Sequence, residues 1–307
     1  MQRRKLGNSD LEISTVGLGC NNFGRRIHDV AVARAVVHRA LDLGITLFDT
    51  ADAYGNGTSE SFLGETLGAR RRQAVIATKF GVGSPAGASR RTIMRTVEAS
   101  LKRLNTDWID LYQVHFPDPS TPIEETLRAL DDLVRQGKVR QIGCSNFSAR
   151  QVDEAQATSK QHGLAAFVTC QDEYSLLVRG IERDRVRAMQ HHGMTLLPYA
   201  PLAGGFLSGK YARGKPLPRD ARLAYSSHHA SDVINDRNWD MMERLREFAT
   251  KTGRSMLEVA FGWLLAKPVV ACVMAGASTP EQVELNARAG SVTLPADDIA
   301  TLDRMTS

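Results

Sequence analysis

Short apolar runs rich in β-branched residues alternate with amphipathic helical patterns along the whole chain. Between the runs, apolar side chains recur at helical spacing, as in Ile93, Val97, Leu101 and Leu104, and again in Ile123, Leu127, Leu130 and Val134. The strand-like runs are residues 15–19, 45–49, 74–79, 108–115, 139–144, 166–171, 195–199 and 269–274. This succession predicts an α/β fold, a closed (β/α)8 TIM barrel of parallel strands with its active site at the C-terminal face.

Two helix starts are readable from local sequence. The segments TPIE at 121–124 and TPEQ at 279–282 each place a threonine before a proline and an acid or amide two residues after it. Thr121 and Thr279 are therefore predicted N-caps, with Pro122 and Pro280 at the first helical position.

A doubly wound open sheet is the alternative architecture. It requires a glycine loop that binds phosphate after the first strand, followed directly by a helix. The segment GLGCNNFG at 17–24 has neither the G-x-G-x-x-G spacing nor a helix immediately behind it. The barrel is the better interpretation, and a chain of 307 residues suits one barrel domain spanning 1–307.

Two regions fall outside the alternation. Residues 2–14 resemble a short β-hairpin turning at residues 7–10, which we expect to close the bottom of the barrel. Residues 201–236 form a long loop after the seventh strand, rich in glycine and proline, and loops of this length are typically functional lids or disordered.

Charge and cysteine content argue against several classes of protein. The net charge of +5 comes from dispersed basic residues interleaved with acids, so nucleic-acid binding is not expected. Cys20, Cys144, Cys170 and Cys272 lack C-x-x-C spacing and lie in apolar runs, which predicts buried thiols rather than disulfides or metal ligands. The charged N-terminus and the lack of a long apolar stretch predict a cytoplasmic protein without a membrane span.

Ionisable side chains stand where three successive strand-like runs end. Asp49 and Tyr54 follow the second run, Lys79 ends the third and His115 ends the fourth. Because parallel strands of a barrel end at the same face, these four groups are expected to converge. A phenol, an ammonium, a carboxylate and an imidazole together could protonate a carbonyl oxygen.

The motifs resemble those of the aldo-keto reductase superfamily along essentially the whole chain. The similar segments are LGITLFDTADAYG (43–55), VIATKFG (75–81), LYQVHFPD (111–118), GKVRQIGCSNF (137–147) and PYAPLAGGFLSGKY (198–211). The layout is most similar to bacterial relatives of aryl-alcohol dehydrogenases and potassium-channel β-subunits. The resemblance implies Tyr54 as the proton donor, with an ammonium at Lys79 lowering the pKa of its phenol. It also implies that Asp49 holds Lys79 and that His115 orients the carbonyl.

The same resemblance implies a site for NADP(H), with NAD(H) the less favoured cofactor. Ser145, Asn146 and Gln171 correspond to positions that bind the nicotinamide carboxamide, and Tyr199 to the aromatic that stacks on the ring. The loop expected to cross the pyrophosphate contributes Pro201, Leu202, Gly204, Leu207 and Lys210. The start of the last predicted cofactor-binding helix contributes Gly276, Ser278, Gln282 and Asn286.

The chain departs from many members of this superfamily at the predicted site for the 2′-phosphate. Ser278 stands where many of them have arginine, and Leu285 stands where many have glutamate. NADPH is still expected to be preferred over NADH, because backbone N–H groups and the helix dipole favour a phosphate at this helix start.

The resulting expectation is a reversible NAD(P)H-dependent reductase of a small-molecule aldehyde or ketone, without a metal. A nucleotide-binding regulatory or redox-sensing subunit with slow turnover is the alternative, and a barrel lyase or isomerase using Lys79 remains a third reading. The sequence says less about the substrate pocket. Five aromatic residues could line it or could equally belong to the hydrophobic core, namely Phe23, Phe80, Phe116, Tyr225 and Trp239.

Overall fold

Eight parallel strands form a nearly closed barrel, seen in the computed structural model, which describes residues 1–83, 86–218, 221–225 and 231–307. In the sheet the strands follow the order β10, β3, β4, β5, β6, β7, β8, β9. Their bounds are β3 (Val16–Gly19), β4 (Leu47–Asp49), β5 (Val75–Phe80), β6 (Ile109–Val114), β7 (Val139–Ser145), β8 (Phe167–Glu173), β9 (Thr195–Tyr199) and β10 (Val273–Gly276). The predicted TIM barrel is confirmed.

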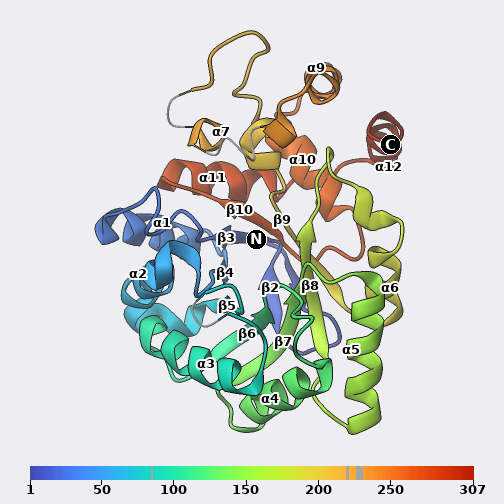
Figure 1. Cartoon of the computed structure of the whole chain (residues 1–307). Coiled ribbons are helices and arrows are strands. Elements are labelled where there is room, and N and C mark those ends of the chain that lie inside the picture. The colour runs from blue at the N-terminus through green and yellow to red at the C-terminus, as the bar shows by residue number, and fades with distance from the viewer. Residues whose placement is uncertain (84–85, 219–220, 226–230) are drawn as a thin grey trace.

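Helices surround the strands on the outside, as Figure 1 shows. The longer helices are α1 (Val30–Asp42), α2 (Thr58–Leu67), α3 (Arg90–Leu104), α4 (Ile123–Arg135), α5 (Ala149–His162), α6 (Arg185–His191), α9 (Asp236–Lys251), α10 (Met256–Leu265), α11 (Pro280–Ala289) and α12 (Ala296–Met305). Short helical turns are η1 (Tyr54–Gly57), η2 (Gly68–Gln73), η3 (Gly180–Glu182), η4 (Ala203–Ser208) and α7 (Arg222–Tyr225). No helix in the described part of the chain is long and apolar enough to cross a membrane.

The predicted helical stripes face the core. Ile93, Val97, Leu101 and Leu104 are all buried along α3. Leu127 and Leu130 are buried along α4, while Ile123 and Val134 at its two ends are partly buried against the same core. The period of 3.6 residues therefore identified the correct face of both helices.

One of the two predicted caps is wrong. Thr279 caps α11 as expected, because its side chain accepts a hydrogen bond from the backbone N–H of Gln282. Thr121 does not cap α4, which begins after Pro122, and its hydroxyl instead donates to the carboxylate of Asp118 at 2.7 Å. Asp118 also accepts from the N–H and hydroxyl of Ser120, so a local turn takes the place of the cap.

The barrel closes through hydrogen bonds just before its last strand. The N–H of Leu196 donates to the carbonyl of Val269 at 2.7 Å, and the N–H of Ala271 donates to the carbonyl of Leu196 at 3.1 Å. The apolar run predicted as a strand at 269–274 therefore has two parts. Its first residues bridge to β9, and the regular strand β10 begins only at Val273.

The N-terminal hairpin closes the bottom of the barrel, as expected. Strands β1 (Arg3–Lys5) and β2 (Glu12–Ser14) pair antiparallel. Leu6 and Ile13 are fully buried and pack with side chains from the beginnings of barrel strands, including Leu47 and Val75. The opposite, C-terminal end of the barrel is left for the site.

The segment 201–236 is not structureless where it is described. It contains the turn η4 and the short helix α7, which contact one another. Figure 1 shows α7 lying beyond the strands, on the side of α11. All four cysteines are free and buried, as predicted.

Candidate active site

A buried ion pair lies at the C-terminal end of the barrel. The ammonium of Lys79 donates to both carboxylate oxygens of Asp49 at 2.7 Å and to the carbonyl of Thr50 at 2.9 Å. Burial alone would lower the pKa of Lys79, but the Asp49 carboxylate and then Tyr54 outweigh it and raise that pKa above its ordinary value. Lys79 is therefore a charged group held in one position.

Tyr54 lies directly against this ammonium. The Lys79 nitrogen is 5.1 Å from the centroid of the Tyr54 ring, which is within the range of a cation–π contact. Tyr54 begins the turn η1, in which Gly55 and Asn56 both adopt left-handed backbone angles. This tight turn after β4 places the phenol over the end of the neighbouring strand β5.

His115 completes the group from the end of β6. Its ring meets the Tyr54 ring edge-on, with 5.9 Å between centroids, and stacks on the half-exposed ring of Phe116. Burial, reinforced by the charge of Lys79, lowers the pKa of His115 to about 3. The imidazole is therefore neutral at physiological pH, and its buried Nδ1 has no hydrogen-bond partner among the described residues.

A chain of hydrogen bonds joins the predicted nicotinamide residues at the ends of β7, β8 and β9. Tyr199 donates its hydroxyl to Asn146 at 2.9 Å, and Asn146 donates its amide to the Ser145 hydroxyl at 3.0 Å. Ser145 donates to the carbonyl of Gln171, whose side-chain amide donates to Asp49 at 3.0 Å. Burial raises the pKa of Tyr199 to about 12, so its hydroxyl keeps its proton. The structure thus connects these four residues to the Lys79 and Asp49 pair.

Residues with strained backbone angles also lie at the ends of these strands. Five non-glycine residues in the described part of the chain have positive φ, and three of them, Asn146, Ala200 and Ala203, follow β7 and β9. Such conformations cost about 1–3 kcal/mol each and cluster at ligand sites. Gly204 and Gly205 continue the left-handed run, leaving a tight backbone without side chains at these two positions. This shape fits close approach of a dinucleotide.

The five loop residues predicted to cross the pyrophosphate differ in how exposed their side chains are to solvent. Leu207 is fully buried and Pro201 is buried, so only their backbone could face a ligand. Leu202 is half-buried, Gly204 is buried in the turn η4, and Lys210 is exposed. The Lys210 ammonium lies 5.3 Å from the centroid of the Tyr211 ring. Lys210 is thus the one side chain of this set that carries a positive charge to the surface.

The start of α11 differs from the expectation in one respect. The backbone N–H of Ser278 is not free, because it donates to the side-chain oxygen of Gln282 at 2.7 Å. Asn286 is buried and donates to the carbonyl of exposed Gly276. Gln282 and Asn286 therefore hold the turn before α11, and a phosphate would have to displace the Gln282 oxygen to reach the Ser278 N–H.

Asn22 is a site residue that sequence reasoning missed. Its amide donates to the hydroxyl of Ser278 at 3.2 Å and to the carbonyl of Ala277 at 3.3 Å. It thereby ties the loop after β3 to the start of α11. Nothing in the local sequence signals a contact between residues so far apart.

Comparison with known proteins identifies the family of this chain. Residues 15–307 match the model of the Aldo/keto reductase family. The chain belongs to the aldo/keto reductase family. It is 34% identical to a probable voltage-gated potassium channel subunit beta of Arabidopsis thaliana, covering 95% of this chain and 92% of that protein. It is 31% identical to L-glyceraldehyde 3-phosphate reductase of Escherichia coli (99% and 92%) and 33% identical to aldo-keto reductase YhdN of Bacillus subtilis (97% and 91%).

The aromatic residues considered for the substrate pocket of this aldo/keto reductase differ in how buried they are. Phe80 is fully buried against Tyr112, and Trp239 is buried against Phe206, so both are core residues. Phe23 is fully buried as well, while Phe116 is half-exposed beside His115. The Tyr225 side chain lies outside the described part of the structure. Phe116 is the aromatic best placed to contact a substrate.

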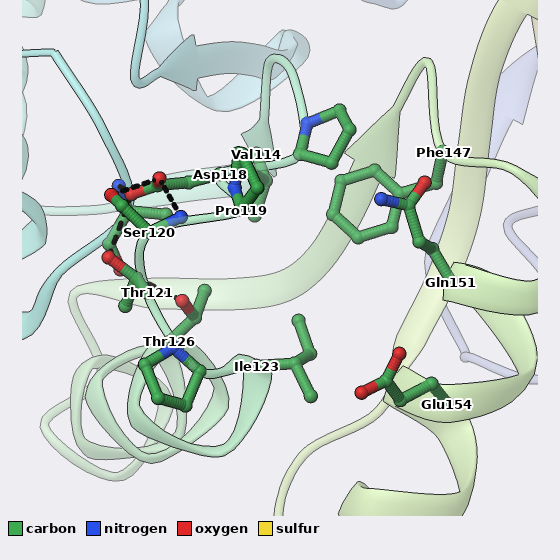
Figure 2. A pocket seen from close by; sticks show the side chains of 13 residues that line it. Val114, Asp118, Pro119, Ser120, Thr121, Ile123, Thr126, Phe147, Gln151 and Glu154 are labelled. Atoms are coloured by element: carbon green, nitrogen blue, oxygen red, sulfur yellow. Dashed lines mark hydrogen bonds between the residues drawn. The ribbon is translucent and has the colours of Figure 1, made fainter.

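A separate hollow lies between the loop after β6 and the starts of α4 and α5 (Figure 2). It measures about 350 Å³ and is lined by Val114, Ile123, Phe147 and Gln151, among others. Val114 rather than the adjacent His115 faces it, so the hollow is separate from the group formed by Asp49, Tyr54, Lys79 and His115.

Proposed function

We propose that this aldo/keto reductase catalyses the reversible, NADP(H)-dependent reduction of an aldehyde or ketone to the alcohol. The observation that best supports this proposal is the buried Lys79 and Asp49 pair, placed against Tyr54 and facing a neutral His115. A charged ammonium next to a phenol favours release of the phenol's proton, which is what carbonyl reduction requires of an acid.

Each residue then has a defined role. The bound nicotinamide supplies the hydride. Tyr54 donates its proton to the carbonyl oxygen, and Lys79 stabilises the negative charge that this leaves on the phenol oxygen. Asp49 keeps Lys79 charged and oriented, and His115, being neutral, can donate a hydrogen bond that orients the carbonyl without adding charge.

The cofactor would lie along the ends of β7 and β9, where the residues with positive φ are found. Ser145, Asn146 and Gln171 would hold the carboxamide and Tyr199 would stack on the nicotinamide, supported by the hydrogen bonds that already fix these side chains. The η4 turn and Lys210 would meet the pyrophosphate, and the start of α11 would meet the ribose phosphate. The same proposal includes a single domain spanning 1–307, a cytoplasmic location and a small-molecule carbonyl as substrate.

The direct test is absorbance at 340 nm with purified protein, a panel of aldehydes and ketones, and NADPH or NADH in parallel. Steady consumption of NADPH with at least one carbonyl compound, and the reverse reaction with the matching alcohol, is expected. No turnover with any member of a broad panel would contradict the proposal.

A regulatory nucleotide-binding subunit is the second candidate, favoured by the similarity to potassium channel β-subunits. It predicts tight NADPH binding with at most a few slow turnovers. Mixing the protein and excess NADPH with aldehyde separates the two, because an enzyme continues through many turnovers after the first, even where product release makes the later ones slower. A lyase or isomerase would instead act on its substrate with no change in nucleotide absorbance.

A further inference from the structure

Helix α2 begins directly after the turn that carries Tyr54. Tyr54 opens η1, and Gly57, the last residue of η1, is also the N-cap of α2. Gly55, Asn56 and Gly57 all have positive φ, so this connection is a tight turn. The position of the Tyr54 backbone therefore depends on where the first turn of α2 is fixed.

Ser59, in the first turn of α2, is bonded to the end of β4. Its hydroxyl donates to the carbonyl of Cys20 at 2.8 Å, and it therefore accepts the 2.8 Å hydrogen bond from the Thr50 hydroxyl. Thr50 follows Asp49 in the sequence, and its own carbonyl accepts from the Lys79 ammonium at 2.9 Å. Ser59 and Thr50 are both fully buried, so these bonds are shielded from solvent.

Glu60, the next residue, is bonded to β5. One oxygen of its carboxylate accepts from the hydroxyl of Thr78 at 2.6 Å. Thr78 precedes Lys79 in the sequence, and both Glu60 and Thr78 are fully buried. Two consecutive residues of α2 are thus bonded to the residue after Asp49 and to the residue before Lys79.

Arg103 on α3 contacts both Glu60 and the turn that carries Tyr54. Its Nε donates to the second carboxylate oxygen of Glu60 at 2.7 Å, and a terminal guanidinium nitrogen lies 2.7 Å from the same oxygen. The Arg103 side chain lies directly over the backbone of Gly57, because a Cβ built on Gly57 would be 2.8 Å from its Cδ and 3.0 Å from its Nε. Arg103 therefore neutralises Glu60 and packs against the last residue of η1 at the same time.

Backbone hydrogen bonds connect the same turn to β5. The N–H of Thr50 donates to the carbonyl of Ala77 at 2.8 Å, and the N–H of Asp52 donates to the carbonyl of Lys79 at 3.1 Å. A displacement of the first turn of α2 relative to β5 would therefore distort these bonds. It would also move the Tyr54 phenol relative to the Lys79 ammonium.

We propose that Ser59, Glu60 and Arg103 are positioning residues of the reductase, which fix the Tyr54 phenol relative to Lys79 through the first turn of α2. The inference rests on the proposed reductase function. A buried ion pair such as that of Glu60 with Arg103 contributes little net stability, so the geometry that it imposes is the better explanation for its presence. Proton transfer depends on the placement of the donor, and a displacement of about 1 Å can lower a rate about a hundredfold.

Thr78→Val tests the bond between Glu60 and β5, because valine keeps the branched shape of threonine but lacks its hydroxyl. Thr78→Ser restores the hydroxyl. The control Thr66→Val removes a buried hydroxyl from the far end of the same helix. We expect kcat for aldehyde reduction to fall about tenfold to a hundredfold in Thr78→Val, while KM and the dissociation constant for NADPH change less than about twofold. Thr78→Ser and Thr66→Val should keep kcat within about twofold of the wild type.

Glu60→Gln tests the charge that holds Arg103. The matched control is Asp110→Asn, because Asp110 is also buried and pairs with Arg71 at 2.8 Å, but it lies near the beginning of β6, at the opposite end of the barrel. Both variants should be less stable in urea, since each leaves a guanidinium without its partner. Only Glu60→Gln should lower kcat, by about tenfold or more. Equal losses of kcat in the two variants would leave Glu60 a merely structural role and overturn the proposal.

Hydrogen exchange of backbone amides tests the positioning without turnover. The N–H groups of Asp52 and Tyr54 are hydrogen-bonded at the turn after β4, so their exchange rates report how often this turn opens. We expect Thr78→Val and Ser59→Ala to speed exchange of these two amides about tenfold, the effect of losing one buried hydrogen bond, and Thr66→Val to leave them unchanged.

Two results would overturn the proposal. One is unchanged exchange at the turn in both Thr78→Val and Ser59→Ala, and the other is a kcat in Thr78→Val equal to that of the wild type. A wild type that reduces no aldehyde would instead contradict the proposed reductase function, and the exchange rates would still decide whether α2 positions the turn.

Discussion

The ammonium nitrogen of Lys79 lies 2.7 Å from both carboxylate oxygens of Asp49, and the Lys79 side chain has no exposed surface. A buried pair of this kind contributes little net stability, because desolvation of both ions offsets their attraction. Removing one partner is different, since it leaves a single charge without compensation inside the barrel. The pair is thus better explained by its contact with Tyr54 than by stability.

Lys79→Met is expected to abolish turnover and to lower the free energy of unfolding by about 3–5 kcal/mol, because it leaves the buried Asp49 carboxylate without its charged partner. The double variant Lys79→Met with Asp49→Asn should recover a large part of that stability but no activity. Urea denaturation of the wild type, both single variants and the double variant measures the coupling. Strictly additive losses would show that the two groups do not interact as described.

Asp49→Asn should move the alkaline limb of the pH profile of kcat/KM to lower pH. In the wild type the carboxylate raises the pKa of Lys79 against the effect of burial, so without it burial prevails and the ammonium loses its proton at a lower pH. Profiles from pH 6 to 10 for wild type, Asp49→Asn and the exposed-surface control Asp107→Asn measure the effect. A limb that stays in place in Asp49→Asn would contradict the coupling.

His115 should make the protein less stable in acid. Its pKa is about 3 in the folded state against 6.5 ordinarily, so the unfolded chain binds the proton more readily and stability falls as pH drops from 6.5 toward 3. Between pH 7 and pH 5 this accounts for about 2 kcal/mol. Urea denaturation at both pH values should show a smaller loss in His115→Gln than in wild type, and an equal loss in both would contradict a neutral buried imidazole.

Ser278→Arg should widen the preference for NADPH over NADH. The new guanidinium would lie at the start of α11, where the 2′-phosphate is proposed to bind, and need not compete for the N–H that Gln282 occupies. Dissociation constants for both cofactors are compared with those of Ser291→Arg, which adds the same charge just beyond the far end of α11. A ratio that changes equally in both variants would mean that the phosphate lies elsewhere.

Much of the fold followed from local pattern. Eight apolar runs and the helical stripes of α3 and α4 were readable because one face of each element must be buried. The strand-end positions of Asp49, Lys79 and His115 followed from the geometry of a parallel barrel, in which neighbouring strands end at one face. Convergence of these residues could therefore be predicted without any contact being known.

The features that the sequence did not predict arise from competing hydrogen-bond acceptors or from contacts between residues far apart in the sequence. Thr121 has the sequence of a cap, but Asp118 three residues earlier offers its hydroxyl a better acceptor. The contact of Asn22 with Ser278 joins two residues that are 256 positions apart in the sequence. No periodicity or spacing encodes such pairs, because they depend on how the loops pack over the finished barrel.

The central claim is that Tyr54 gives the proton to the carbonyl oxygen. The most direct measurement is kcat/KM for NADPH-dependent aldehyde reduction in Tyr54→Phe, together with the dissociation constant for NADPH. The account predicts a rate lower by about 10²–10⁴ with cofactor affinity unchanged, because only the hydroxyl is removed. Turnover close to that of the wild type would contradict it.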